Sequence, residues 1–304
     1  MACAEASSRT LQRNALIGLV ASVGLAAVKF VAGVLGHSSA LVADAVESLA
    51  DSVGSIIVWQ GLRVARREPD EEHPYGYGKA EALAALSVGV LLLAAAGIIV
   101  SKALSELVTP HNAPAWWTLL VLVAVVAVKE TMFRFLMSSA DEFRSDAARA
   151  DAWHHRSDAI TSAAALVGVA IAVWGPGMFA MPRLVLADEV AALLASAIIV
   201  VTALRLMRPS LRELLDGTDH ELVALVRATA AEVEGVRLIE KVYVRKSGSL
   251  YHVDMHLHVD PLLSVENGHA LAGRVKARLR EQIANVQHVL IHIEPACDES
   301  PGER

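Results

Sequence analysis

The sequence predicts an α-helical polytopic membrane protein with six transmembrane helices, followed by a C-terminal α+β cytoplasmic domain. The composition is too apolar for a soluble protein, since 54% of the 304 residues are hydrophobic and 20% are charged, and the mean hydropathy is +0.45. Six long apolar segments follow one another, and the last third of the chain changes to an ordinary mixed-charge sequence. We therefore expect two domains, a transmembrane domain over 1–212 and a cytoplasmic domain over 213–304.

Each apolar segment is long enough to cross the hydrocarbon core, which takes about 20 residues. The predicted spans are 14–35, 40–65, 80–108, 115–137, 147–174 and 184–208. Short turns with few basic residues join them in pairs, the last at Gly175-Pro176-Gly177 with Met181-Pro182. The other connections are rich in basic residues, so the positive-inside rule places both termini in the cytoplasm. The residues on that side are Arg9, Arg13, Arg63, Arg66, Arg67, Lys79, Arg134, Arg144, Arg149, Arg205, Arg208 and Arg212.

Acidic residues interrupt the second span at helical spacing. Asp44, Glu47 and Asp51 lie at i, i+3 and i+7, so a helix there aligns their carboxylates on one face. A charged side chain at the bilayer centre costs about 2.5–3.5 kcal/mol on insertion scales and needs a partner. In the fifth span, His154 and Asp158 are four residues apart at a similar depth. The two spans together predict one divalent-metal site with the ligands Glu47, Asp51, His154 and Asp158.

Three carboxylates and one imidazole suit zinc, iron, cobalt or manganese, and the set lacks the thiolates that copper(I) favours. The structural alternative is a buried ion-pair network with arginine or lysine. We disfavour it, because we find no basic residue at a matching depth and expect Lys29 and Lys102 to extend to the membrane interface. For Asp44, a proton-relay or entry role and simple solvation at the start of the helix both stay open.

The C-terminal third has the pattern of a compact α+β domain. We expect a helix at about 219–234, strands at 236–246 and 250–259, a helix at about 264–284 and a last strand at 286–293. This α-β-β-α-β order predicts a ferredoxin-like fold with the helices on one face of the sheet. In the second strand His252, His256 and His258 alternate with apolar residues. Metal binding and simple solvent exposure of these histidines both stay open.

The loop after the second span contains the run Tyr75-Gly76-Tyr77-Gly78-Lys79-Ala80-Glu81, which by composition alone is an acidic solvated turn. Together with the six spans, the two four-residue motifs and the α-β-β-α-β tail, it makes the chain resemble the cation diffusion facilitator family over nearly its whole length. The resemblance implies a homodimer in the lipid bilayer that exports divalent metal from the cytoplasm in exchange for protons. It implies that the four predicted ligands form the transport site. The resemblance implies neither a nucleic-acid partner nor an enzyme activity.

The resemblance also implies metal sites outside the spans. In the loop, Asp70 and His73 match, but Tyr77 stands where a second histidine is usual, so we expect a weakened or absent site. In the cytoplasmic domain the resemblance implies a binuclear cluster on His256, His269, His292 and Glu294, with Glu240 in place of a usual histidine. It further implies that Lys79 pairs with Asp216 near the membrane surface. Asp188 matches a commonly acidic position to which no role is assigned.

With an acidic residue at position 47 and a histidine at 154, the chain resembles the zinc and iron branches of the family. The resemblance therefore favours Zn²⁺ or Fe²⁺ as the transported ion and as the ion bound by the cytoplasmic domain. Manganese, cobalt and cadmium are further possible substrates. A bacterial inner membrane is the expected location. The alternative function is a membrane-anchored metal sensor or scaffold whose cytoplasmic domain binds metal without transport. An intramembrane metalloenzyme is disfavoured, because the sequence has no His-Glu-x-x-His motif.

Overall fold

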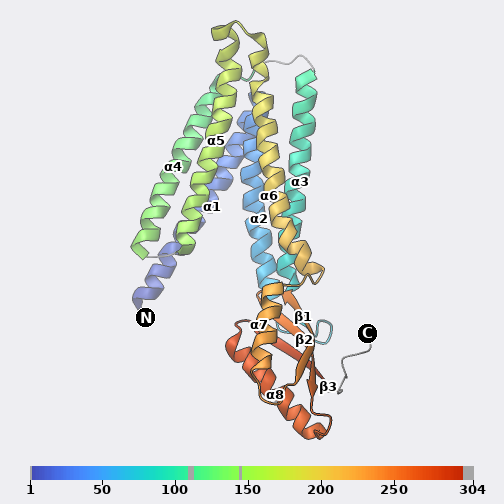
Figure 1. Cartoon of the computed structure of the whole chain (residues 1–304). Helices are drawn as coiled ribbons and strands as arrows, with labels where there is room; N and C mark the ends of the chain where they lie inside the picture. Colours follow the sequence, from blue (N-terminus) through green and yellow to red (C-terminus); the bar gives the residue numbers. More distant parts are fainter. Residues whose placement is uncertain (1, 109–112, 144–145, 297–304) are drawn as a thin grey trace. The chain divides into compact units, whose positions relative to one another are not determined.

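The computed structural model describes residues 2–108, 113–143 and 146–296 (Figure 1). The described chain divides into two compact units, one of residues 1–57 and 87–206 and the other of residues 58–86 and 207–304. The elements are α1 (Ala2–Leu35), α2 (Ser39–Ala65), α3 (Lys79–Val108), α4 (Trp117–Phe143), α5 (Asp146–Phe179), the 3₁₀ turn η1 (Pro182–Leu186), α6 (Ala187–Leu214), α7 (His220–Ala231), β1 (Leu238–Ser247), β2 (Leu250–Val259), α8 (Val265–Gln282) and β3 (Val286–Pro295).

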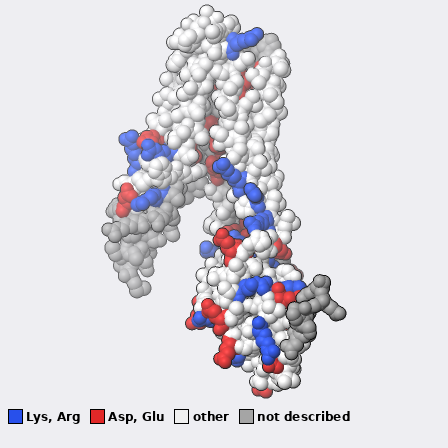
Figure 2. All heavy atoms as spheres, viewed as in Figure 1, with Lys and Arg blue, Asp and Glu red and all other residues white. Residues whose placement is uncertain are grey.

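The predicted transmembrane helices are confirmed as α1 to α6 in the described residues. Four stretches are apolar enough to cross a membrane by composition: Leu16–Leu35, Lys79–Val108, Ala152–Phe179 and Pro182–Leu214. The other two helices, α2 and α4, carry charged residues near their middles, and some of these, Asp51 of α2 and Lys129 of α4, lie at or beside the site described below. On the face seen in Figure 2 the helical part is uncharged over most of its length, whereas the cytoplasmic domain carries both signs.

Of the turn predicted at Gly175-Pro176-Gly177 with Met181-Pro182, the first part is wrong, whereas Met181 and Pro182 do lie in the connection between α5 and α6. Helix α5 continues through Pro176 and ends at Phe179, and the left-handed residue Ala180, with φ of 52°, then reverses the chain. Proline removes one helical hydrogen bond without forcing a reversal, and membrane helices tolerate it because neighbouring groups satisfy the freed carbonyl. The fifth span is therefore longer than the sequence indicated.

The helices of the first unit pack in two sets, with α1, α4 and α5 in one and α2, α3 and α6 in the other (Figure 1). Small residues bring the helices close: a Cβ on Gly168 of α5 would lie 2.4 Å from the Cβ of Ala191 on α6. One apolar cluster, which includes Leu41, Leu122 and Val169, joins the two sets. This packing sets α2 beside α5, as the predicted site requires.

Asp188 at the start of α6 caps the start of α2. Its carboxylate accepts hydrogen bonds from Ser38 Oγ at 2.7 Å and from the backbone amides of Ser39 and Ala40 at 2.5 and 3.3 Å. These amides belong to the first turn of α2, which has no intrahelical acceptors for them, and the positive end of the helix dipole favours a carboxylate there. The structure thus gives the unassigned acidic residue a role in fixing α2.

The cytoplasmic sheet has the order β1-β2-β3, with β1 antiparallel and β3 parallel to β2. Val253, Met255 and Leu257 of β2 point into the core, where they meet Leu271 and Val275 of α8 and residues of α7. The opposite face of β2 carries the alternating histidines, as the period-2 pattern predicted. The α-β-β-α-β domain with helices on one sheet face is therefore confirmed.

In the second unit, the loop between α2 and α3 packs against the β1–β2 turn. A Cβ on Gly78 would lie 2.5 Å from the carbonyl oxygen of Ser247, so only glycine permits this approach. Lys79 Nζ lies 2.8 Å from Asp216 Oδ1, which confirms the predicted ion pair within one chain. Both side chains are exposed by more than 40%, so the pair contributes about 0–1 kcal/mol.

Candidate metal centre

The two predicted motifs meet inside the helical unit. Asp51 lies near the middle of α2, and His154 and Asp158 lie one turn apart on α5. Each of the three offers one ligand atom, and these atoms all lie within 4.8 Å of one another. His154 Nδ1 is 3.8 Å from Asp158 Oδ1. A single metal ion between them would have two oxygen ligands and one nitrogen ligand.

Glu47 lies one turn before Asp51 on α2, and among the described residues it is not part of this three-residue group. It interacts electrostatically with Asp51 and Asp158. Its role as a ligand stays a prediction.

The expectation that no basic residue reaches the depth of the carboxylates is wrong. Lys129, near the middle of α4, lies with Nζ 2.5 Å from Asp158 Oδ2, and its side chain is 1% exposed. Lys29 of α1, expected at the interface, is fully buried with Nζ 2.9 Å from Asp44 Oδ1. Lys29 is retained inside because Asp44 and the hydroxyl of Ser48, at 2.6 Å, replace its hydration.

Asp44 is therefore a structural partner in the described residues rather than a solvated helix start. It is 3% exposed, and the hydroxyl of Ser162 on α5 lies 2.8 Å from its Oδ2. By contrast Lys102 is 42% exposed and lies 3.8 Å from Glu106, which agrees with the expected position near the interface. Depth along the helix alone did not separate the two lysines.

In the loop between α2 and α3, the side chains of the predicted metal site contact one another. Asp70 accepts hydrogen bonds from the Tyr77 hydroxyl at 2.5 Å and from the His73 amide at 2.7 Å, and both hydrogen bonds hold the pKa of Asp70 below its usual range. The rings of His73 and Tyr77 lie 4.3 Å apart. In residues 58–86 no group of three ligand atoms within reach of one ion is present. The weakened metal binding of this loop stays a prediction.

Strand register assembles the cytoplasmic cluster. In the parallel pair of β2 and β3, His256 lies beside His292 and His258 beside Glu294, all on the face away from the helices. Glu294 Oε1 is 2.6 Å from His256 Nδ1 and 3.5 Å from His292 Nε2. These three form one group that could hold a metal ion.

A second group shares Glu294 and adds Glu240 and His258. His258 Nε2 is 3.3 Å from Glu294 Oε2 and 3.6 Å from Glu240 Oε2. His258 is missing from the ligands that the resemblance implied, although its alternation with His256 on β2 was visible. His269, on α8, belongs to neither group in the described residues, and it lines a groove with His292. Its role as a ligand stays a prediction.

Comparison with known proteins decides the family. The sequence matches the cation efflux transmembrane domain over residues 15–215 and the cation efflux protein cytoplasmic domain over residues 218–296. The chain belongs to the cation efflux family. This cation efflux protein is accordingly a multi-pass membrane transporter of divalent metal cations and not an enzyme, and it has a dimerising cytoplasmic domain.

Several relatives match more than nine-tenths of this chain. The manganese efflux system protein MneP of Bacillus subtilis is 30% identical over 95% of this transporter and 97% of its own chain. The magnetosome protein MamB of Paramagnetospirillum magneticum is 32% identical over 91% of both chains. Metal tolerance protein C1 of Arabidopsis thaliana is 33% identical over 92% of this chain and 61% of its own. A solved structure of a MamM-CTD variant is 26% identical over 25% of this chain and 93% of that chain, with a TM-score of 0.24.

We expect Glu294→Gln to abolish metal-induced stabilisation of the cytoplasmic domain, because Glu294 is the carboxylate that both ligand groups share. A ligand at a hundredfold excess over its Kd stabilises a protein by about 2.7 kcal/mol. Thermal unfolding of the full chain is measured with and without Zn²⁺ or Mn²⁺, in an Asp51→Asn background that removes the central site. Glu232→Gln, an exposed glutamate paired with Arg278, is the control. An unchanged metal effect in Glu294→Gln would refute the assignment.

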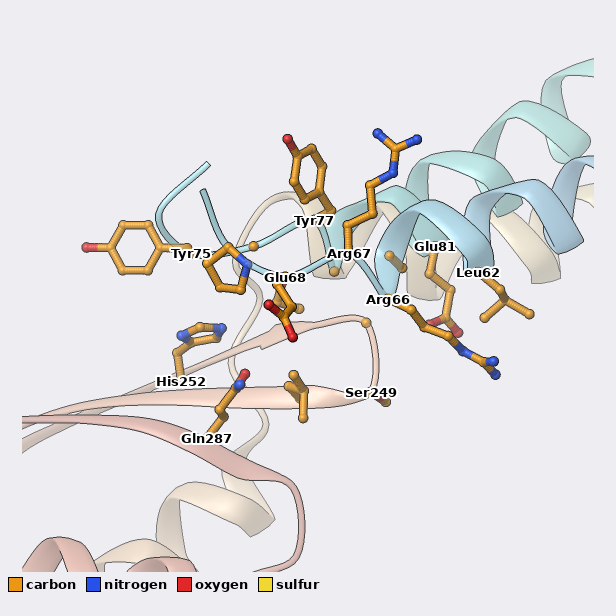
Figure 3. Close-up of a pocket in the computed structure, with 17 residues that line it drawn as sticks. Leu62, Arg66, Arg67, Glu68, Tyr75, Tyr77, Glu81, Ser249, His252 and Gln287 are labelled. Carbon is orange, nitrogen blue, oxygen red and sulfur yellow. The ribbon is translucent and has the colours of Figure 1, made fainter. Parts of the chain in front are cut away.

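A pocket of about 440 Å³ lies beside the loop between α2 and α3 in the second unit (Figure 3). His252 of β2 lines it and is 5% exposed, and its Nδ1 has no hydrogen-bond partner in the described residues. The ring of Tyr75 lies 6.0 Å from that of His252 and 6.3 Å from that of His288. The loop between α2 and α3 therefore lies against His252 of β2 and His288 of β3 through the ring of Tyr75.

Burial lowers the pKa of His252 below its ordinary value of about 6.5, and the charge of Arg245 and the neighbouring His288 act in the same direction. The unfolded chain therefore binds a proton at higher pH than the folded domain does. Neutral His252 therefore contributes its full stabilisation to the folded domain above about pH 6.5. This stabilisation is lost as the pH falls from there through the lower pKa of the folded state. We expect hydrogen exchange in β2 to speed up between pH 7.5 and 5.5, after correction for intrinsic rates, and His252→Phe to reduce this change. The same substitution at the exposed His220 should leave it intact.

Proposed function

We propose that this protein is a homodimeric exporter of a divalent first-row transition metal, driven by inward proton movement and operating by alternating access. The observation that carries the proposal is the convergence of Asp51, His154 and Asp158 from two helices, with ligand atoms within 4.8 Å of one another. Carboxylates and imidazole must be deprotonated to bind metal. Metal binding therefore expels protons, and protonation from the other side expels metal.

The ligand set supports manganese, zinc or iron as substrate. Three carboxylates, if Glu47 joins, and one imidazole provide the oxygen-rich environment that manganese accepts and that zinc and iron also use. The resemblance favoured zinc and iron, but relatives such as MneP are named for manganese efflux. We therefore propose manganese as a candidate substrate beside zinc and iron. Geometry alone does not rank these three, so all are tested in parallel.

We further propose that the protein lies in a bacterial inner membrane with both termini in the cytoplasm. We also propose that the transmembrane domain ends and the cytoplasmic domain begins near residue 212. The described basic residues Arg63, Arg66 and Arg149 support this orientation through the positive-inside rule. Arg144 lies outside the described residues, as do the side chains of Arg9 and Arg13. The cytoplasmic histidine and glutamate groups are proposed as metal ligands that join the two subunits, and the loop site as one that binds metal weakly or not at all.

Metal flux into proteoliposomes tests the proposal. Purified protein is reconstituted, and uptake of manganese, zinc and iron(II) is followed with and without an imposed pH gradient. We expect gradient-dependent flux of at least one of these ions. Metal binding without flux for any ion would favour the membrane-anchored sensor or scaffold, and flux that persists unchanged without proton counter-movement would favour a channel.

A further inference from the structure

Lys129 is buried at the centre of the helical unit, beside a predicted metal ligand. Its Nζ lies 2.5 Å from Asp158 Oδ2 and 3.2 Å from Ser22 Oγ of α1, and its side chain is 1% exposed. An ammonium group that has lost its water is stable in a membrane helix only with such partners. Lys129 is therefore a fixed part of this site and does not extend to the interface.

The two oxygens of Asp158 face different neighbours. Oδ2 accepts the hydrogen bond from Lys129, while Oδ1 is the oxygen that lies 3.8 Å from His154 Nδ1. The lysine thus holds one oxygen of the carboxylate and leaves the other oxygen on the side of His154. A second group that orients a ligand in this way commonly tunes metal affinity as well.

Lys129 also sets the charge of the cluster. Four carboxylates of α2 and α5 belong to this cluster, and two buried lysines pair with two of them: Lys29 with Asp44, and Lys129 with Asp158. With the four carboxylates ionised, both lysines protonated and every histidine neutral, the formal net charge of the cluster is −2. The four carboxylates are Asp44, Glu47, Asp51 and Asp158. Binding of one divalent cation would bring this formal charge to zero. Without the charge of Lys129, the metal-free cluster would carry a formal charge of −3.

We propose that Lys129 is a positioning and charge-setting residue of the transport site. It orients Asp158 toward the metal, and its positive charge keeps the site from binding a divalent ion too tightly to release. The inference rests on the proposed function, because it requires that metal binds at Asp51, His154 and Asp158. It assigns the lysine no contact with the metal itself.

The test separates orientation from charge with two substitutions. Lys129→Gln keeps a hydrogen-bond donor for Asp158 but removes the charge, and Lys129→Arg keeps the charge. We expect Lys129→Gln to lower the KM for metal flux by about tenfold or more and to lower the maximal rate, because a nearby positive charge no longer opposes the bound ion. Lys129→Arg should stay near the wild-type KM. Isothermal titration with Mn²⁺ or Zn²⁺ in detergent should show the same tightening without transport.

Lys102→Gln, at the exposed lysine of α3, is the matched control and should change neither constant. Lys129→Met is a second variant that removes both donor and charge, so the test survives if one variant folds poorly. A KM for Lys129→Gln that is unchanged or raised, with wild-type flux intact, would overturn the inference alone. Absence of metal flux and of metal binding in the wild-type protein would instead overturn the proposed function.

Discussion

Asp51→Asn is expected to reduce metal flux to the level of protein-free liposomes while the protein stays folded. The substitution preserves the shape of the side chain but replaces a carboxylate with a neutral amide. Asp51 is the only ligand that α2 contributes to the described three-residue group, so its loss leaves His154 and Asp158 on a single helix. Two ligands one turn apart cannot enclose an ion, and one of the groups whose protonation exchanges with metal is gone.

Asp141→Asn is the matched control for this measurement. Asp141 lies near the end of α4, is 61% exposed and pairs with Arg149 at 3.0 Å, so the same chemical change occurs away from the ligand group. We expect this variant to retain wild-type flux. Size-exclusion chromatography and thermal unfolding show whether both variants are equally well folded. Wild-type flux through a well-folded Asp51→Asn protein would remove Asp51 from the transport site.

Lys29→Met is expected to destabilise the protein by about 3–5 kcal/mol, the usual cost of leaving one member of a buried ion pair without its partner. Lys29 and Asp44 are 0% and 4% exposed, and Lys29 also donates to the Asp44 carbonyl oxygen at 3.0 Å. Methionine fills a similar volume, but among the described residues it leaves the Asp44 carboxylate with the hydroxyl of Ser162 as its one hydrogen-bond donor. Residual folded protein after heating in detergent measures the loss.

A second substitution tests whether the unpaired charge is the cause. Asp44→Asn in the Lys29→Met protein should recover a large part of the lost stability, because no buried carboxylate then lacks a cation. Lys102→Met provides the surface comparison, since Lys102 is 42% exposed and 3.8 Å from its partner, and it should change stability by less than about 1 kcal/mol. Equal losses for the two lysine variants would show that the buried pair has no special importance.

Local periodicity determined much of this protein from the sequence alone. Apolar segments of membrane-spanning length predicted the helices, and the four-residue spacing of His154 and Asp158 fixed a shared helical face before any packing was known. Alternation along 250–259 likewise predicted which face of β2 is buried. These features depend only on backbone geometry, which repeats every 3.6 residues in a helix and every two in a strand.

Tertiary structure alone decided which charges meet across helices. Position along a helix gives depth but not the neighbour that a side chain faces, so only the packing of α1 and α4 shows that Lys29 and Lys129 lie against Asp44 and Asp158. Strand register, which no single strand encodes, brought His258 beside Glu294. In each case a side chain's partner depends on the rotation and offset of a second element. Those are set by the packing of the whole fold and are absent from local sequence pattern.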